Sequence, residues 1–275
     1  SKVAEEHNMP MVATAASAEE IWSRGLRNIF GVDTPAGSYL KNICAVCMTD
    51  ASTAALLYAD TEFVRETAEG ARRNAEHNGL KFLVDESYPP EQRDFSELVR
   101  RLKKAGPDVI MGVTSLEDSI AMARAIRDAN VRPKMLAFTV GPALREFGEQ
   151  LGDDAEGVVG VVQWLPGVPV PGAQDFSYRY RQRYGNNPGV HAVIGYSAGQ
   201  ILEAAIRLAG STDPDAVREQ LGSMFFRSLL GKYQVDETGR QIGKRNYVMQ
   251  WQDNRRRLVS PEEVAESTLV YPLPW

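Results

Sequence analysis

Few residues in this chain have the types and spacing that chemistry requires. Residues 195–199 match the G-x-S-x-G pattern of serine hydrolases, with Ser197 as the nucleophile. Such a serine needs a histidine base that follows it in the chain. The three histidines are His7, His77 and His191, so none follows Ser197. The apolar residues around this serine also recur at helical spacing, and we therefore expect no hydrolase chemistry.

The two cysteines, Cys44 and Cys47, form a C-x-x-C pair. A redox pair of this kind needs a helix N-terminus, where the dipole lowers the thiol pKa. Here the pair falls in the middle of an apolar stretch, residues 39–48, and we interpret it as two small buried thiols in a helix. Without two further ligands or a glycine-rich nucleotide motif, the sequence predicts no metal and no cofactor.

Composition excludes further classes of protein. The chain has 275 residues, of which 43% are hydrophobic, enough for one large domain or two small lobes. A net charge of −5 and a pI near 5.4 disfavour a nucleic-acid partner. No apolar stretch approaches the ~20 residues of a membrane span. The dense basic run at 255–257 is interpreted as a solvated turn.

The elements that would position a site recur between residues 54 and 140. An apolar strand, a polar turn and an amphipathic helix follow one another, with strands expected at 54–58, 108–113 and 134–138. Short apolar strands that alternate with helices are typical of parallel sheets with right-handed crossovers. The loops that follow such strands meet at one edge of the sheet, where ligands bind. We therefore expect an α/β fold with a binding site at this edge.

Candidate site residues lie at the predicted strand exits. Residues 15–17 place backbone N–H groups and a hydroxyl after a short strand, where Ser17 and Glu20 have the spacing of a capping box. Free N–H groups at a helix N-terminus attract an anion, although Ser17 could equally serve only as a cap. Thr114 and Ser115 follow the strand at 108–113 in a similar way.

Beyond residue 140, a stiff segment rich in proline and glycine, residues 166–172, is the best candidate for a lobe boundary. Two strands near 231–235 and 247–251 are expected to form an antiparallel pair. Phe63, in the first turn after the strand at 54–58, either lines a pocket or packs on its own helix.

Several short motifs occur in an order that resembles a known family. Together they are similar to the type I periplasmic binding proteins, specifically the branch that binds branched-chain amino acids for ABC importers. The motifs are LYADTEF (57–63), RDFSEL (93–98), GPDVI (106–110), DAEGV (154–158), YGNNP (184–188) and GKYQVDETG (231–239).

The resemblance implies two Rossmann-like α/β lobes with parallel sheets, joined by a hinge of crossing strands. Lobe 1 would contain residues 1–48 and 171–228, lobe 2 residues 49–170 and 229–254, and residues 255–275 would form a C-terminal tail. Family members begin with further strands and helices, so the resemblance also implies that the first part of lobe 1 is missing from this sequence.

The resemblance also implies a set of ligand-binding residues. Ala15, Ala16 and Ser17 match the segment that holds the ligand carboxylate. Phe63 matches an aromatic residue that covers the ligand, Thr114 and Ser115 match a ligand-facing turn, and His191 matches a position on the cleft rim.

One position departs from the family pattern. Thr139 stands where members that bind amino acids have an acid that pairs with the ligand's ammonium. A buried ammonium without a carboxylate partner is costly. We therefore expect a ligand with a carboxylate but no α-ammonium, such as an oxo acid or an aromatic acid. An acid from elsewhere, for example Glu117 or Asp118, would overturn this expectation.

The function implied is that of an extracytoplasmic, periplasmic solute-binding protein of an ABC importer, without catalysis. It would bind a small carboxylate-bearing solute, such as a branched-chain amino acid, an oxo acid or an aromatic acid, in a cleft between the lobes. Its partner would be a membrane permease. The sequence shows no signal-peptide pattern at its start. The alternative is a cytoplasmic ligand-sensing regulator with the same fold.

Overall fold

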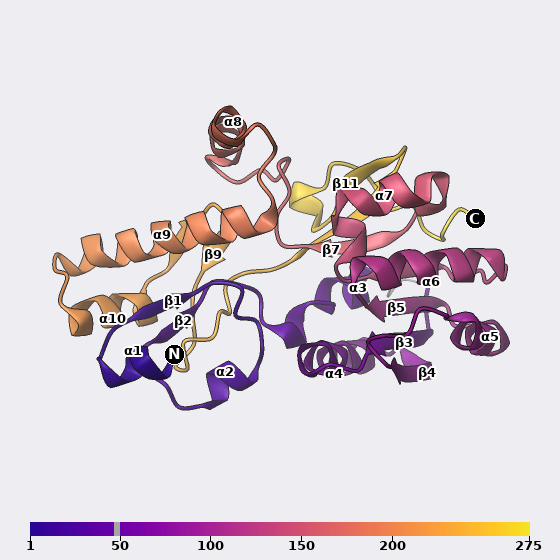
Figure 1. Cartoon of the computed structure of the whole chain (residues 1–275), viewed down its shortest axis with the longest axis horizontal. Helices are drawn as coiled ribbons and strands as arrows, with labels where there is room; N and C mark the ends of the chain where they lie inside the picture. The colour runs from indigo at the N-terminus through magenta and orange to yellow at the C-terminus, as the bar shows by residue number, and fades with distance from the viewer. Residues whose placement is uncertain (47–49) are drawn as a thin grey trace. The chain divides into compact units, whose positions relative to one another are not determined.

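The computed structural model describes residues 1–46 and 50–275, and it divides the chain into two compact α/β units (Figure 1). Unit 1 consists of Ser1–Pro35 and Gln163–Asn246, and unit 2 of Ala36–Val162 and Tyr247–Trp275. The chain therefore passes between the units three times, after residues 35, 162 and 246. Each unit is described separately below.

Unit 2 is built around a seven-stranded sheet with the order β11-β10-β7-β6-β5-β3-β4. Strands β3 to β7 are parallel, and β10 and β11 continue the sheet in antiparallel pairs. Every residue of β5, β6 and β7 is buried, as expected for strands covered on both faces. The parallel sheet predicted from residues 54–140 is confirmed. The strands are β3 (Thr53–Ala59), β4 (Lys81–Tyr88), β5 (Val109–Val113), β6 (Met135–Phe138), β7 (Val159–Val162), β10 (Tyr247–Gln252) and β11 (Arg255–Ser260).

Helices connect the parallel strands of unit 2 and cover its core. The longest of them, α4, packs against the 3₁₀ turn η1. This close approach needs glycine at position 70, because a side chain there would collide with the backbone of Gly37. The connecting helices are α4 (Glu62–His77), α5 (Ser96–Ala105), α6 (Leu116–Asp128) and α7 (Arg145–Leu151), and the 3₁₀ turns are η1 (Ala36–Ser38), η2 (Gly141–Ala143) and η3 (Gly152–Ala155).

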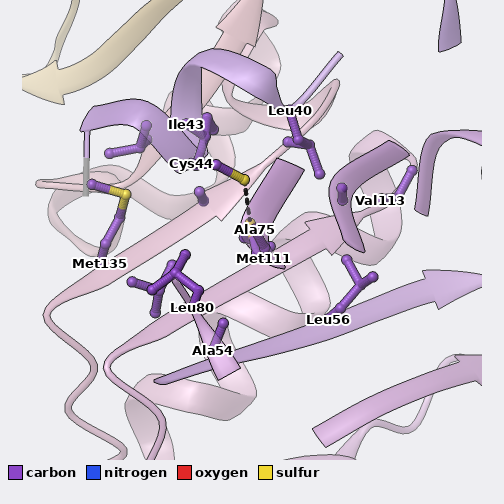
Figure 2. Packing of buried hydrophobic residues seen from close by; sticks show 14 of the residues in the cluster. Leu40, Ile43, Cys44, Ala54, Leu56, Ala75, Leu80, Met111, Val113 and Met135 are labelled. Atoms are coloured by element: carbon purple, nitrogen blue, oxygen red, sulfur yellow. Dashed lines mark hydrogen bonds between the residues drawn. The ribbon is translucent and has the colours of Figure 1, made fainter. Parts of the chain in front are cut away.

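Helix α3 (Lys41–Val46) contributes Cys44 to the core of unit 2 (Figure 2). The Cys44 side chain is fully buried, and its Sγ lies 4.0 Å from the Sδ of Met111 on β5. The expectation of a buried helical thiol is confirmed for Cys44. Cys47, the second residue of the pair, lies outside the described residues.

Asp108 connects the starts of neighbouring strands at the amino-terminal edge of the same sheet. Its Oδ2 accepts hydrogen bonds from the backbone N–H groups of Ser52 and Thr53, at 2.9 and 3.0 Å, and from the Thr53 hydroxyl at 2.9 Å. The Lys134 ammonium lies 3.2 Å from its Oδ1. These contacts join the starts of β3, β5 and β6, and the hydrogen bonds hold the pKa of Asp108 well below its ordinary value of 3.8.

We expect the substitution Asp108→Asn to lower the free energy of unfolding by about 2 kcal/mol, because it weakens charge-assisted hydrogen bonds. A depressed carboxyl pKa contributes stability that is present above the ordinary pKa and is lost as the pH falls. The difference between wild type and variant should therefore hold at neutral pH and shrink below about pH 4. Urea unfolding at several pH values measures it, and an equal difference at pH 3 and pH 7 would contradict this account.

Unit 1 contains a pair of short parallel strands, β1 (Met11–Ala13) and β2 (Ile29–Gly31), with a small core of Ala13, Trp22 and Ile29. The Asp213 side chain caps the N-terminus of α10 by accepting hydrogen bonds from the N–H groups of Asp215 and Ala216. The remaining elements are α1 (Lys2–Glu6), α2 (Glu20–Ser23), α8 (Ala173–Tyr184), α9 (Val190–Ala209), α10 (Pro214–Ser223), β8 (Phe226–Ser228) and β9 (Gly231–Tyr233).

The units differ from the expected lobes at three places, the first of which is residues 163–170, expected in lobe 2 and found in unit 1. Residues 36–48 were assigned to lobe 1, but the described part of this segment belongs to unit 2, where η1 and α3 pack against α4. Residues 229–246 were assigned to lobe 2 and belong to unit 1. The reason is that β9 pairs with β8 of unit 1. The expected pairing of 231–235 with 247–251 is wrong, because β10 pairs with β7 and β11 instead.

The interpretation of residues 255–275 as a tail is also wrong at its start. Residues 255–257 belong to β11, which pairs along its length with β10, so the basic run lies in a strand and not in a turn. The segment that follows is fastened to unit 2 by hydrogen bonds between Val270 and Gln250 and by the Trp275 indole, which donates to the Glu156 carbonyl at 2.7 Å. It contains one 3₁₀ turn, η4 (Glu262–Val264).

Candidate functional site

The carboxyl ends of β1 and β2 bring two segments of unit 1 together. Ala13 pairs with Gly31, and the Val32 N–H donates to the Ala13 carbonyl at 3.2 Å. Residues 15–17 begin two positions after the end of β1, and Asp33 lies two positions after the end of β2. The predicted segment Ala15, Ala16 and Ser17 therefore has an acidic neighbour, which sequence reasoning did not single out.

The helix that follows residues 15–17 differs from the expected one. Helix α2 has four residues, its N-cap is Glu19, and no side chain caps it. The predicted capping box of Ser17 and Glu20 is therefore wrong. The Glu20 carboxylate instead accepts from Arg24, at 2.8 Å. Because a single helical turn has only a small dipole, the dipole argument for an anion at Ser17 loses its basis.

Asp33 is the most unusual side chain at this edge. It is 1% exposed, and neither carboxylate oxygen accepts a hydrogen bond of ordinary geometry from the described residues. Burial raises the pKa of Asp33, whereas the nearby N–H groups of Ala15 and Ala16 and the charges of Lys244 and His191 act in the opposite direction. His191 lies in the first turn of α9 and is exposed. Of the predicted site residues, Ala15, Ala16 and His191 thus act on the charge of a buried acid.

Lys244 brings a buried positive charge to the same region of unit 1. Its Nζ donates to the Gln163 carbonyl at 2.9 Å, and burial lowers its pKa to about 7, with the Asp33 charge opposing that shift. Next to these residues, the buried Thr34 hydroxyl donates to Asn246 Oδ1 at 2.7 Å. Asp33, Thr34, Gln163, Lys244 and Asn246 all lie within three positions of a point where the chain passes from one unit to the other.

We expect Lys244 to make the stability of unit 1 depend on pH. Between about pH 7 and its ordinary pKa of 10.5, Lys244 is protonated in the unfolded chain and largely neutral in the folded one. The unfolded chain then binds more protons, so the free energy of unfolding should rise with pH, by up to about 1.4 kcal/mol per unit. Urea unfolding between pH 7 and 9.5 should show this slope in wild type and lose it in Lys244→Met. An unchanged slope in the variant would contradict the assignment.

The carboxyl edge of the sheet in unit 2 holds the other predicted residues. Thr114 follows β5 and Thr139 follows β6. The Thr139 Oγ1 lies 3.2 Å from the Thr114 N–H, which donates to it, and 3.4 Å from the Thr114 carbonyl. The Thr114 hydroxyl is itself buried and has no hydrogen-bond partner among the described residues. Ser115 caps α6 by accepting from the Asp118 N–H at 3.1 Å.

Phe63 is the second residue of α4, and its side chain is 39% exposed. Its ring meets the edge of the Tyr39 ring, with centroids 6.0 Å apart, so the ring packs against residues that precede β3 and not only on its own helix. Part of the Phe63 ring therefore stays exposed to solvent in unit 2.

Two acids near this edge were alternatives for the ammonium partner that Thr139 does not provide. Glu117 is exposed, whereas Asp118 is buried and well paired. The Tyr88 hydroxyl donates to Asp118 at 3.1 Å, and Arg93 Nη1 lies 3.4 Å from its other oxygen. Burial and the Asp118 charge raise the pKa of Tyr88. The charge of Asp118 is thus balanced by Arg93 within unit 2.

The serine motif has a structural role. Residues 195–199 lie inside α9, and the buried Ser197 Oγ accepts a hydrogen bond from the Leu230 N–H at 2.9 Å. Across residues 1–46 and 50–275, acidic, cysteine and histidine side chains form no cluster that could hold a metal ion. The same residues include no helix with the length and apolar character to cross a membrane.

The fold agrees with comparisons to known proteins. A model of the family described as "Periplasmic binding protein" matches residues 1–256. The chain therefore belongs to the periplasmic binding protein family. It is similar to the Leu/Ile/Val-binding protein homolog 7 of Brucella melitensis, at 24% identity over 99% of this chain and 73% of that protein.

Two solved structures with the same fold have ligands in their names. One is an ABC transporter substrate-binding protein from Desulfitobacterium hafniense in complex with Leu, with a TM-score of 0.78, 17% identity, and coverage of 94% of this chain and 75% of that one. The other is an ABC transporter solute-binding protein from R. palustris in complex with benzoate, with a TM-score of 0.77, 16% identity, and coverage of 98% and 74%.

Proposed function

We propose that the protein is the solute-binding component of an ABC importer and that it binds a small solute with a carboxylate group. The observation that carries the proposal is the match to the periplasmic binding protein family, in a chain whose polar residues follow the buried parallel strands of each unit. Its partner would be a membrane permease and its location extracytoplasmic, as the names and the family of its relatives suggest.

The solute class follows from the site residues and from the ligands of similar proteins. Leucine and benzoate, bound by two structural neighbours, share a carboxylate and an apolar body. We infer a branched-chain amino acid, an oxo acid or an aromatic acid as the solute. In unit 1, residues 15–17 are the proposed carboxylate-binding segment, and His191 is a further proposed contact. In unit 2 the proposed contacts are Phe63, Thr114, Ser115 and Thr139.

We expect a thermal-shift screen to show stabilisation by leucine, its oxo acid or benzoate. A solute at ~100 times its dissociation constant adds about 2.7 kcal/mol, which should raise the melting temperature by a few degrees. Leucinamide, which lacks the carboxylate, is the matched control and should produce no shift. Stabilisation by leucinamide equal to that by leucine would refute a carboxylate-binding site, and the absence of any shift would refute the proposed solute class.

The unpartnered Thr114 hydroxyl gives a test within unit 2. Replacing Thr114 by Val removes a buried hydroxyl without breaking a hydrogen bond, so the free energy of unfolding should stay within about 0.5 kcal/mol of wild type. If that hydroxyl binds the solute, affinity should fall about fivefold in calorimetry. The matched control is Thr67→Val, whose hydroxyl donates to the Phe63 carbonyl at 3.1 Å. It should lose stability and keep affinity, and the reverse pattern would exclude Thr114 from the site.

A further inference from the structure

Lys244 and Asp33 carry opposite charges inside unit 1. The Lys244 side chain is 7% exposed and that of Asp33 is 1% exposed, and the charge of each acts on the other. The Lys244 Nζ donates to the Gln163 carbonyl at 2.9 Å, so its nearest described acceptor is a neutral main-chain oxygen. Because taking an ammonium out of water is costly, the protein holds the proton on Lys244 weakly.

These two charged residues lie where the chain leaves unit 1. Asp33, Gln163 and Lys244 each lie close to a different one of the three passages between the units, and the Thr34 hydroxyl donates to Asn246 Oδ1 at 2.7 Å beside them. Gln163, Thr34 and Asn246 are neutral, so Asp33 is the charge that acts on Lys244. Relative movement of two domains falls on a few backbone torsions in the segments that join them. The proton on Lys244 is thus held by segments that respond to such a movement.

Lys244 and Asp33 also border the proposed carboxylate-binding segment. The N–H groups of Ala15 and Ala16 act on the Asp33 carboxylate, and so does the charge of His191 in the first turn of α9. Ala15 is exposed, so this segment borders solvent as well as the buried acid. An anion that arrives at this segment brings a negative charge near Lys244, and a nearby opposite charge favours the protonated form of a lysine.

We propose that Lys244 takes up a proton when the protein binds a carboxylate solute, so that the solute binds more tightly at acidic than at alkaline pH. The inference rests on the proposed function, because it takes the solute's carboxylate to lie at residues 15–17. The charge that the solute brings to unit 1 is then balanced by a lysine that is largely neutral in the free protein above neutral pH.

Proton uptake gives the affinity a definite dependence on pH. Burial lowers the pKa of Lys244 to about 7 in the free protein, and the bound carboxylate raises it again. Below the pKa of the free protein, Lys244 is charged with and without solute, and pH has little effect on affinity. Above it, the free protein has lost the proton and regains it on binding. The affinity therefore falls as the pH rises, by at most about tenfold per pH unit.

The test is calorimetry of the whole chain with the tightest binder among leucine, its oxo acid and benzoate, between pH 6.5 and 8.5. Titrations at pH 8 in phosphate and in Tris, which differ in ionisation enthalpy, give the number of protons taken up. Wild type should take up about half a proton per solute, and its affinity should fall about tenfold over this range. Lys244→Met and Lys244→Arg should take up no proton and show no such fall, because neither side chain titrates there. A merely structural role of Lys244 would change the affinity without proton uptake.

The matched control is Lys232→Met, which removes an exposed lysine of β9 in the same unit and should keep both the proton uptake and the pH dependence. His191→Gln should also keep the proton uptake at pH 8. If circular dichroism shows that Lys244→Met does not fold, Lys244→Arg decides alone. Binding by wild type without proton uptake, or uptake that persists in Lys244→Arg, overturns the inference and leaves the proposed function standing. Binding of none of the three solutes overturns both.

Discussion

The burial of parallel strands on both faces is the constraint on which unit 2 depends. Strands β5, β6 and β7 have no solvent-facing residue, so helices must cover both sides of the sheet and return the chain to the same starting edge. All strand exits then lie at the opposite edge. At the starting edge, Asp108 accepts hydrogen bonds from Ser52 and Thr53. At the opposite edge, the strand exits carry the polar residues Thr114 and Thr139, which are hydrogen-bonded to each other.

The two buried acids illustrate how differently a fold can treat the same group. Asp118 lies where Tyr88 and Arg93 reach it, so its charge is balanced and its oxygens are occupied. Asp33 meets backbone N–H groups at imperfect geometry and an ammonium that donates elsewhere. A buried charge that the fold does not fully satisfy costs stability, and such costs are characteristic of sites that bind something else.

The sequence predicted much of unit 2 and little of the site in unit 1. Short apolar runs bounded by turns, such as 109–113, are typical of strands buried in a sheet. Strand β4 alternates buried and exposed residues at the edge of the sheet, and that pattern did not stand out from its polar surroundings. The predicted capping box does not form, because the Glu20 carboxylate pairs with Arg24 instead, and sequence spacing alone does not reveal this competing ion pair. Asp33 was not singled out because its burial arises only in the folded chain, where the charge of Lys244, more than 200 positions away, also acts on it.

The two polar edges of this protein differ in the charges that they carry. In unit 2 the carboxyl ends of the strands present hydroxyl groups, the Asp118 carboxylate paired with Arg93, and the partly exposed ring of Phe63. Such groups are suited to a molecule with an apolar body and hydrogen-bonding groups. In unit 1 the exits offer an unsatisfied carboxylate, a buried lysine and an exposed histidine, which respond to the charges of a solute. A buried site that lacks a matching charge rejects a solute more strongly than a poor apolar fit does. Under the proposed function, we therefore expect unit 1 to select between charged classes of solute and unit 2 to select by size and shape.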